Sequence, residues 1–217
     1  MADSRLLKKD LFGEIRQSSD AGEVLIVRDL SAATIWVRWF ARRLMRREAR
    51  ALAALAHVDG VPEILSVQRN VLVRSYIAGM PMNRARPADP RYFNAAARLL
   101  RRLHRAGVVH NDLAKEPNLL VRDDNSPAFI DFQLAWFASR RNRLFRLLAH
   151  EDLRHLLKHK RTYCPQQLTQ RERRILANPT LLSRVWMRTV KPAYLFVTRR
   201  LFGWADREGA HDRGDRT

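Results

Sequence analysis

The chain has 217 residues, of which 46% are hydrophobic, so it can bury a core and is not intrinsically disordered. It contains no apolar run long enough to cross a bilayer, no features of a signal peptide, and a single cysteine, which excludes an intrachain disulfide. We therefore expect a cytoplasmic protein with Cys164 packed in its interior. The net charge of +19 favours polyanionic partners such as nucleotides, RNA or anionic lipid, although an arginine-rich solvated surface explains it equally well.

The first part of the chain predicts strands around one basic helix. The β-branched run at residues 23–28 (EVLIVR) indicates a buried strand. Residues 34–57 present an apolar face of leucine and alanine and predict a helix, with Glu48 in its middle. Its arginines are Arg42, Arg43, Arg46, Arg47 and Arg50. Residues 63–77 predict a hairpin, and the glycine and proline within 79–81 then interrupt regular structure.

The second part of the chain predicts mostly helix. Asp89 suits the N-cap and Pro90 the first position of a helix that Gly107 ends. The apolar stripe of this helix consists of Phe93, Ala97, Leu100 and Leu103. Residues 136–217 predict further helices. The order of elements therefore predicts an α+β chain of two parts that meet near residue 79.

Polar side chains gather in the loop and short hairpin that follow the capped helix. Residues 109–121 read VHNDLAKEPNLLV, and Asp131 ends the predicted strand AFID. The hairpin between the two segments brings Asp112 and Asp131 together, with Asn118 between them. Two carboxylates and a carboxamide offer hard oxygen ligands for Mg²⁺ and a proton acceptor. Phosphoryl transfer depends on these groups, because its catalysis consists of positioning and charge neutralisation.

The motif VVHNDLAKEPNLLV followed by FIDFQLA resembles the catalytic loop and metal-binding segment of the protein-kinase-like superfamily. It most resembles small bacterial serine/threonine kinases related to RIO kinases and to lipopolysaccharide core (Kdo/heptose) kinases. The resemblance covers residues 5–137. It implies a compact bilobal protein-kinase-like fold, with a small β-rich N-lobe at residues 1–78. A mostly helical C-lobe at residues 79–217 would carry the catalytic loop, the metal-binding segment and a basic helical tail.

The resemblance implies a role for each polar residue of the loop. Asp112 would be the catalytic base that accepts the proton of the substrate hydroxyl. Asn118 would hold one Mg²⁺ or Mn²⁺, and Asp131 would bridge the metal to the β- and γ-phosphates of ATP. Lys115 would reach the γ-phosphate, although a solvated lysine explains this residue equally well. His110 would brace the loop.

The resemblance also implies which residues bind ATP. Arg28 would contact the α- and β-phosphates and pair with Glu48 of the basic helix. Gly13 would belong to the loop that covers the phosphates. Adenine would bond to the backbone of the segment RSYIAG, which links the lobes.

The sequence departs from the family pattern in four ways. Arg28 replaces the usual lysine, which keeps the charge but presents a planar fork. Residues 10–24 contain glycine only at 13 and 22, so the phosphate-covering loop is degenerate. One extra residue separates Asp112 from Asn118. No Ala-Pro-Glu motif follows IDFQLA, so we expect no long activation segment to serve as a substrate platform.

The leading interpretation is an ATP-dependent phosphotransferase with a protein serine or threonine hydroxyl as acceptor. One alternative is a lipopolysaccharide core sugar kinase at the inner membrane surface, which the short C-lobe and basic aromatic tail favour. Another is a pseudokinase acting as a binding module, which Arg28 and the poor glycine loop favour. The retained Asp112, Asn118 and Asp131 argue against the pseudokinase.

Two basic stretches rich in aromatic residues, at residues 34–47 and 186–204, suggest a further surface role. They would pack between the lobes, lie on an anionic membrane surface or stack on RNA bases. Packing is the simplest interpretation, and membrane contact would make the protein peripheral at the inner membrane. Nucleic acid is disfavoured as a partner because the sequence has no RNA-binding motif.

Overall fold

The computed structural model describes residues 4–10, 13–20, 22–31 and 33–178. The aromatic stretch at 186–204 lies outside the described residues. The chain divides into a compact unit Met1–Leu176 and a second unit Ala177–Thr217, and the candidate site lies in the first. Within the described part, no helix is both long and apolar enough to span a membrane.

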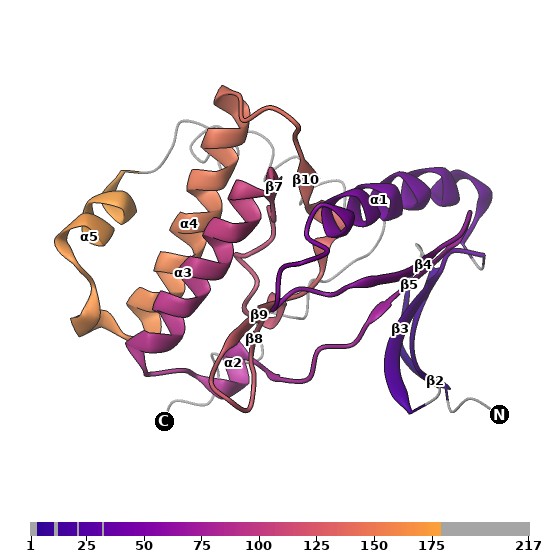
Figure 1. Ribbon diagram of the computed structural model, residues 1–217, viewed down its shortest axis with the longest axis horizontal. Helices are drawn as coiled ribbons and strands as arrows, with labels where there is room; N and C mark the ends of the chain where they lie inside the picture. The colour runs from indigo at the N-terminus through magenta and orange to yellow at the C-terminus, as the bar shows by residue number, and fades with distance from the viewer. Residues whose placement is uncertain (1–3, 11–12, 21, 32, 179–217) are drawn as a thin grey trace, which may run out of the picture. The chain divides into compact units, whose positions relative to one another are not determined.

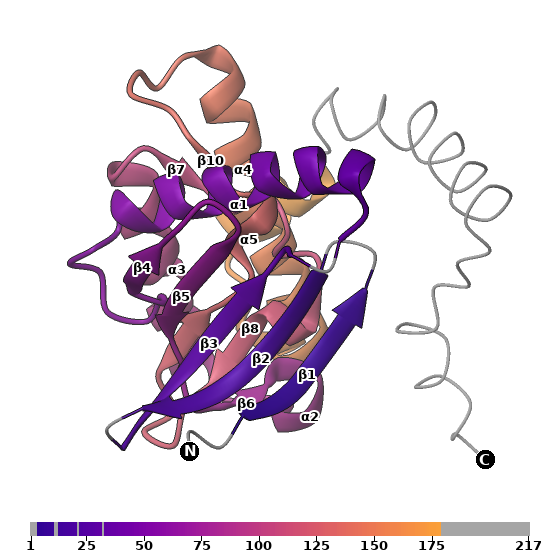
Figure 2. The same cartoon turned by 90° about the vertical axis from the view of Figure 1, so that its right-hand side faces the viewer.

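The N-terminal region contains a five-stranded antiparallel sheet. Its strands are β1 (Ser4–Asp10), β2 (Gly13–Asp20), β3 (Glu23–Asp29), β4 (Ile64–Val67) and β5 (Val71–Ser75). Their order is β1-β2-β3-β5-β4, and Figure 2 shows the first three side by side. The predicted β3 strand and β4–β5 hairpin are confirmed. Strands β1 and β2 were not predicted, because both are polar along most of their length and β1 carries an irregularity after Leu6 that breaks the alternation.

Helix α1 (Ile35–Ala53) packs against this sheet. Its residues Ala41 and Met45 form a small core with Leu30 and Leu72 from the sheet region. The helix was predicted to extend to residue 57 but ends earlier. The last turn tightens, with the Leu55 amide donating to the Leu52 carbonyl at 2.9 Å, and the chain then turns toward β4.

The larger core lies between two helices and a short hairpin. Helices α3 (Pro90–Arg105) and α4 (Arg143–Tyr163) run side by side (Figure 1). Asp89 caps α3 by accepting from the Arg91 amide at 2.8 Å, as the sequence predicted. The buried residues of α3 are Tyr92, Phe93, Ala96, Leu99, Leu100 and Leu103. They pack with Phe129 and Phe132, which flank the candidate metal-binding segment.

Short elements connect these layers. They are β6 (Met80–Pro81), α2 (Met82–Ala85), β7 (Val108–Val109), β8 (Leu119–Val121), β9 (Pro127–Phe129), β10 (Trp136–Phe137) and α5 (Gln170–Ala177). The predicted β8–β9 hairpin is confirmed, but β9 ends before Asp131, which adopts a left-handed conformation. Residues 136–137 pair with β7 as a strand, where helix was predicted. Cys164 is buried as expected, with its thiol donating to the Ala88 carbonyl at 2.9 Å.

Candidate active site

A buried histidine braces the loop that carries Asp112. The His110 ring is fully buried and packs against Phe132, with 4.6 Å between ring centroids. Its Nε2 donates to the Ile130 carbonyl at 3.0 Å, which leaves Nδ1 to accept the Asp112 amide at 3.3 Å. Burial lowers the pKa of His110, so the ring is neutral. His110 therefore joins the loop of Asp112 to the segment of Asp131.

A buried aspartate from α4 holds the backbone of the same loop. Asp152 is 1% exposed, and its two carboxylate oxygens accept from the amides of His110 at 2.7 Å and Asn111 at 2.9 Å. Asn111 has a φ of 62°, a left-handed conformation that such bonds help to maintain. This role of Asp152 was not predicted from the sequence. A signal existed, because Asp152 is an acidic residue on the same helical stripe as the apolar Phe145 and Leu156.

Asp112, Lys115 and Asn118 are in direct contact. The Asn118 Nδ2 donates to Asp112 Oδ2 and to the Asp112 backbone oxygen, each at 3.0 Å. The Lys115 Nζ lies 3.0 Å from the same Oδ2. A short 3-10 turn (Glu116–Asn118) accommodates the extra residue of this loop. In this turn the Asn118 amide donates to the Lys115 carbonyl at 3.1 Å. The longer spacing thus still brings the three side chains together.

The electrostatic environment of Asp112 favours proton acceptance. Burial raises the pKa of the Asp112 carboxyl, Lys115 lowers it, and the neighbouring Asp131 carboxylate raises it again; the net shift is upward. The Lys115 side chain is 59% exposed, so solvent screens its contribution. A carboxylate with a raised pKa is a stronger base than a solvated one.

Asp131 presents a buried carboxylate oxygen beside the candidate base. Its Oδ1 is buried and has no hydrogen-bond partner among the residues that the structure describes. A buried unpaired carboxylate oxygen is costly, and a bound cation would satisfy it. Over the described ranges, no group of three or more His, Cys, Asp or Glu side chains is placed to hold a metal. Asn118 and Asp131 would therefore hold an ion only together with oxygens of another molecule, as in Mg·ATP.

Arg28 and Glu48 form a buried ion pair. The Arg28 Nη1 donates to Glu48 Oε2 at 3.1 Å, and the two side chains are 7% and 1% exposed. A second guanidinium, that of Arg74 on the adjacent strand, lies 2.8 Å from Glu48 Oε1 without hydrogen-bond geometry. The sequence analysis did not anticipate Arg74. Two guanidiniums around one carboxylate leave a net positive charge at this point, which suits a phosphate.

Gly13 is the first residue of β2 and lies beside the end of β3. Its φ is 122°, and a Cβ at this position would collide with the Asp29 carbonyl oxygen. The close approach of the two strands therefore requires glycine here. Contact of Gly13 with a nucleotide phosphate stays a prediction.

Arg47 connects α1 to the segment that follows Asp131. Its guanidinium donates to the Leu134 carbonyl at 3.1 Å and to the next carbonyl at 3.3 Å. The Asn111 Nδ2 donates to the same Leu134 oxygen at 3.0 Å. The helix that carries Glu48 is thereby tied to both halves of the candidate site. The sequence analysis had counted Arg47 only among the arginines of the helix.

Comparison with known proteins identifies the family of this chain. The RIO domain model matches residues 28–174, which is most of the chain, and the chain therefore belongs to the RIO domain family. The RIO-type serine/threonine-protein kinase Rio1 of Haloferax volcanii is 39% identical over 69 residues, which cover 29% of this chain and 23% of that protein.

The fold has a solved counterpart. The crystal structure of the Rio2 kinase from Chaetomium thermophilum matches with a TM-score of 0.60 at 19% identity, over 83% of this chain and 60% of the other. The predicted α+β bilobal protein-kinase-like fold is thus confirmed. The chain spans under a quarter of the length of the archaeal relative and three-fifths of the fungal structure.

Proposed function

We propose that this protein is an ATP-dependent phosphotransferase that acts on serine or threonine hydroxyls of a protein. The observation that carries the proposal is the buried Asp112 carboxylate, held by Asn118 and Lys115 beside the unpaired oxygen of Asp131. The name of the archaeal relative, a serine/threonine-protein kinase, supports a protein acceptor. Cytoplasmic ATP would be the phosphoryl donor.

In the proposed mechanism, Asp112 accepts the proton of the attacking hydroxyl. Asn118 fixes the carboxylate through the bond from its Nδ2, and the Lys115 ammonium lies where it offsets negative charge on the transferred phosphoryl group. Mg²⁺ or Mn²⁺ held by Asn118 and Asp131 would supply further neutralisation of the phosphates.

Arg28 is proposed to contact the α- and β-phosphates, with Glu48 and the N-lobe at 1–78 orienting it toward a C-lobe that begins at residue 79. Because lysine keeps the positive charge, Arg28→Lys is expected to retain phosphotransfer. Arg28→Ala is expected to raise the KM for ATP about tenfold or more. Wild-type kinetics in Arg28→Ala would show that Arg28 contacts no phosphate.

Thermal unfolding with ATP, in the presence and absence of Mg²⁺ or Mn²⁺, tests the nucleotide site. A ligand that binds only the folded chain stabilises it by about 2.7 kcal/mol at a hundred times its dissociation constant. We expect ATP to raise the midpoint of thermal unfolding only when the metal is present, and we expect Asp131→Ala to remove this rise. The control Asp123→Ala, in the exposed β8–β9 turn, should retain it. The absence of any shift at millimolar ATP would favour the pseudokinase interpretation.

The acceptor is identified by transfer of radiolabelled phosphate from ATP in a cell extract. Label in protein bands, lost in Asp112→Asn, is the expected result. Label in the lipid fraction would instead favour the lipopolysaccharide core sugar kinase and a location at the membrane surface.

A further inference from the structure

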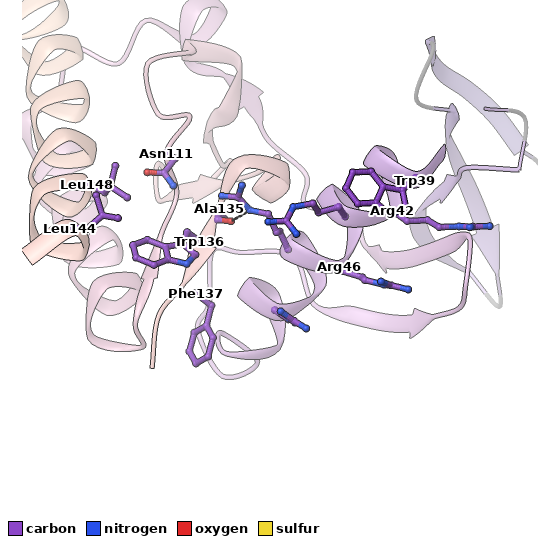
Figure 3. Close-up of a pocket in the computed structure, with 12 residues that line it drawn as sticks. Trp39, Arg42, Arg46, Asn111, Ala135, Trp136, Phe137, Leu144 and Leu148 are labelled. Carbon is purple, nitrogen blue, oxygen red and sulfur yellow. Dashed lines mark hydrogen bonds between the residues drawn. The ribbon is translucent and has the colours of Figure 1, made fainter. Parts of the chain in front are cut away.

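An arginine-lined pocket lies beside the candidate active site, on the outer side of α1. It has a volume of about 730 Å³, which is within the usual range of ligand sites. Arginines and Trp39 of α1 line one side, while Trp136 and Phe137 of β10 and Leu144 of α4 line the other (Figure 3).

The arginines give the lining of this pocket a positive charge. Five arginines line it, and the described lining residues include no carboxylate. Two of the five have structural bonds: Arg42 donates to Asn70 at 2.8 Å, and Arg47 holds the Leu134 carbonyl. No hydrogen bond or ion pair joins the guanidinium groups of the other three, Arg43, Arg46 and Arg50, to any part of the chain that the structure describes.

The guanidiniums of α1 stand close to one another around the pocket. Burial, followed by the neighbouring Arg43, lowers the pKa of Arg47. Five like charges around one concavity repel one another, and an anion placed among them would relieve that repulsion. The pocket therefore selects for negative charge.

The opposite wall of the pocket is apolar and solvent-exposed. On this wall Leu144 is 50% exposed and Phe137 is 40% exposed, and Trp39, on the arginine side, is 68% exposed. A ligand that combines carboxylates with an apolar side chain would match both walls. We propose that this pocket is a docking site for an acidic segment of the protein substrate, a proposal that rests on the phosphotransfer function inferred above.

The position of the pocket connects docking to phosphoryl transfer. Asn111 lines the pocket and directly precedes Asp112, the proposed base. An extended peptide advances about 3.3 Å per residue, so acidic residues within a few positions of the acceptor serine or threonine would reach the arginines. Arg47 and Asn111 both line the pocket, and both donate to the Leu134 carbonyl.

The shape and lining favour a peptide over other polyanions. A nucleic-acid strand is recognised by a basic track along its backbone, whereas this basic surface is one pocket, bounded on its other side by Trp136, Phe137 and leucine side chains. A membrane requires an apolar face that lies flat on lipid, whereas the arginines here line a concavity.

The test compares two triple variants of the full chain with equal loss of charge and equal spacing along a helix. The pocket variant is Arg43→Gln, Arg46→Gln and Arg50→Gln. The control variant, on the exposed face of α3, is Arg98→Gln, Arg101→Gln and Arg105→Gln. The probe is a fluorescein-labelled peptide with a serine followed by glutamates and a leucine, and its reference is the same peptide with glutamines. Binding is followed by fluorescence anisotropy at physiological salt, so the readout needs no catalysis.

We expect the wild type and the α3 variant to bind the glutamate peptide about tenfold or more tightly than the glutamine peptide, and the pocket variant to lose this preference. Equal affinity of the wild type for both peptides would overturn the proposal. An equal loss in both triple variants would also overturn it, because overall charge rather than the pocket would then attract the peptide.

Two competitors separate the sources of negative charge. Displacement of the peptide by a uridine oligonucleotide or by phosphatidylglycerol vesicles at lower concentration than by unlabelled glutamate peptide would refute a peptide site. If the pocket variant loses cooperative unfolding, the single variant Arg46→Gln is measured in its place. It is expected to weaken binding of the glutamate peptide but not of the glutamine peptide. If the glutamate peptide binds but no phosphate is transferred, the docking site is supported and the proposed reaction is refuted.

Discussion

Asp152→Asn is expected to destabilise the fold and to slow phosphotransfer, although Asp152 lies on α4 and touches no substrate in the proposed mechanism. The carboxylate accepts the amides of His110 and Asn111 with one oxygen each. Asparagine has a single acceptor oxygen, so its amide group would face one of these buried N–H groups. The substitution therefore exchanges two charge-assisted bonds for one neutral bond and one unsatisfied donor.

The magnitude follows from this exchange. A hydrogen bond to a charged group contributes about 1.5–3 kcal/mol, and an unsatisfied buried donor costs about 1–3 kcal/mol. We expect a loss of about 3 kcal/mol in the free energy of unfolding, which lowers the Tm by about 6–12 °C for a chain of this size. Release of the Asn111 backbone would also shift the adjacent Asp112, and a displacement near 1 Å costs about a hundredfold in rate.

Urea unfolding and phosphate transfer, measured on the same preparations, check this prediction. Asp123→Asn removes the same charge from an exposed turn and should leave both quantities near those of the wild type. If Asp152→Asn unfolds within about 0.5 kcal/mol of the wild type, the two amide bonds do not hold the loop and the reasoning fails.

Three further substitutions test the surroundings of the site. Glu48→Gln leaves Arg28 without its buried counter-ion and should lower the free energy of unfolding, measured in urea, by about 3–5 kcal/mol. A decrease of under about 1 kcal/mol would refute a structural ion pair. Because the pKa of Asp112 is raised in the folded chain, its ionisation destabilises the fold above the usual aspartate pKa. Asp112→Asn should therefore raise the Tm at neutral pH, and the gain should vanish as the pH falls below about 4; a lower Tm at neutral pH would contradict this. Gly13→Ala should lower the Tm more than Gly22→Ala, since both have positive φ but a Cβ at Gly22 meets no atom within 4 Å; equal effects would exclude the close strand approach as the cause.

The sequence predicted the parts of the site that lie close together along the chain. Asp112, Lys115 and Asn118 fall within one loop, so a local motif already implied their contact, and the structure adds the 3-10 turn that absorbs the extra residue. The resemblance also suggested Arg28 and Glu48 as partners, which the structure finds as a buried pair.

Contacts between segments that lie far apart along the chain could not be predicted from the sequence in the same way. Asp152 lies 42 residues from His110 and reaches it only because α4 packs beside β7. Arg74 meets Glu48 because β5 pairs with β3, and a strand register is not encoded in either strand alone. The strands β1 and β2 lacked the hydrophobic alternation on which prediction depends.

The Asp112 loop is held by three elements that come from different parts of the chain. His110 binds it to the Ile130 carbonyl, Asp152 binds its backbone from α4, and Asn111 shares the Leu134 carbonyl with Arg47 of α1. Since the last of these bonds lies at the arginine pocket, occupation of the pocket would act on the same carbonyl that orients the loop. A docked acidic peptide would therefore stabilise α1 and the loop of the base together, which is how a binding site outside the reacting atoms can raise kcat as well as lower KM.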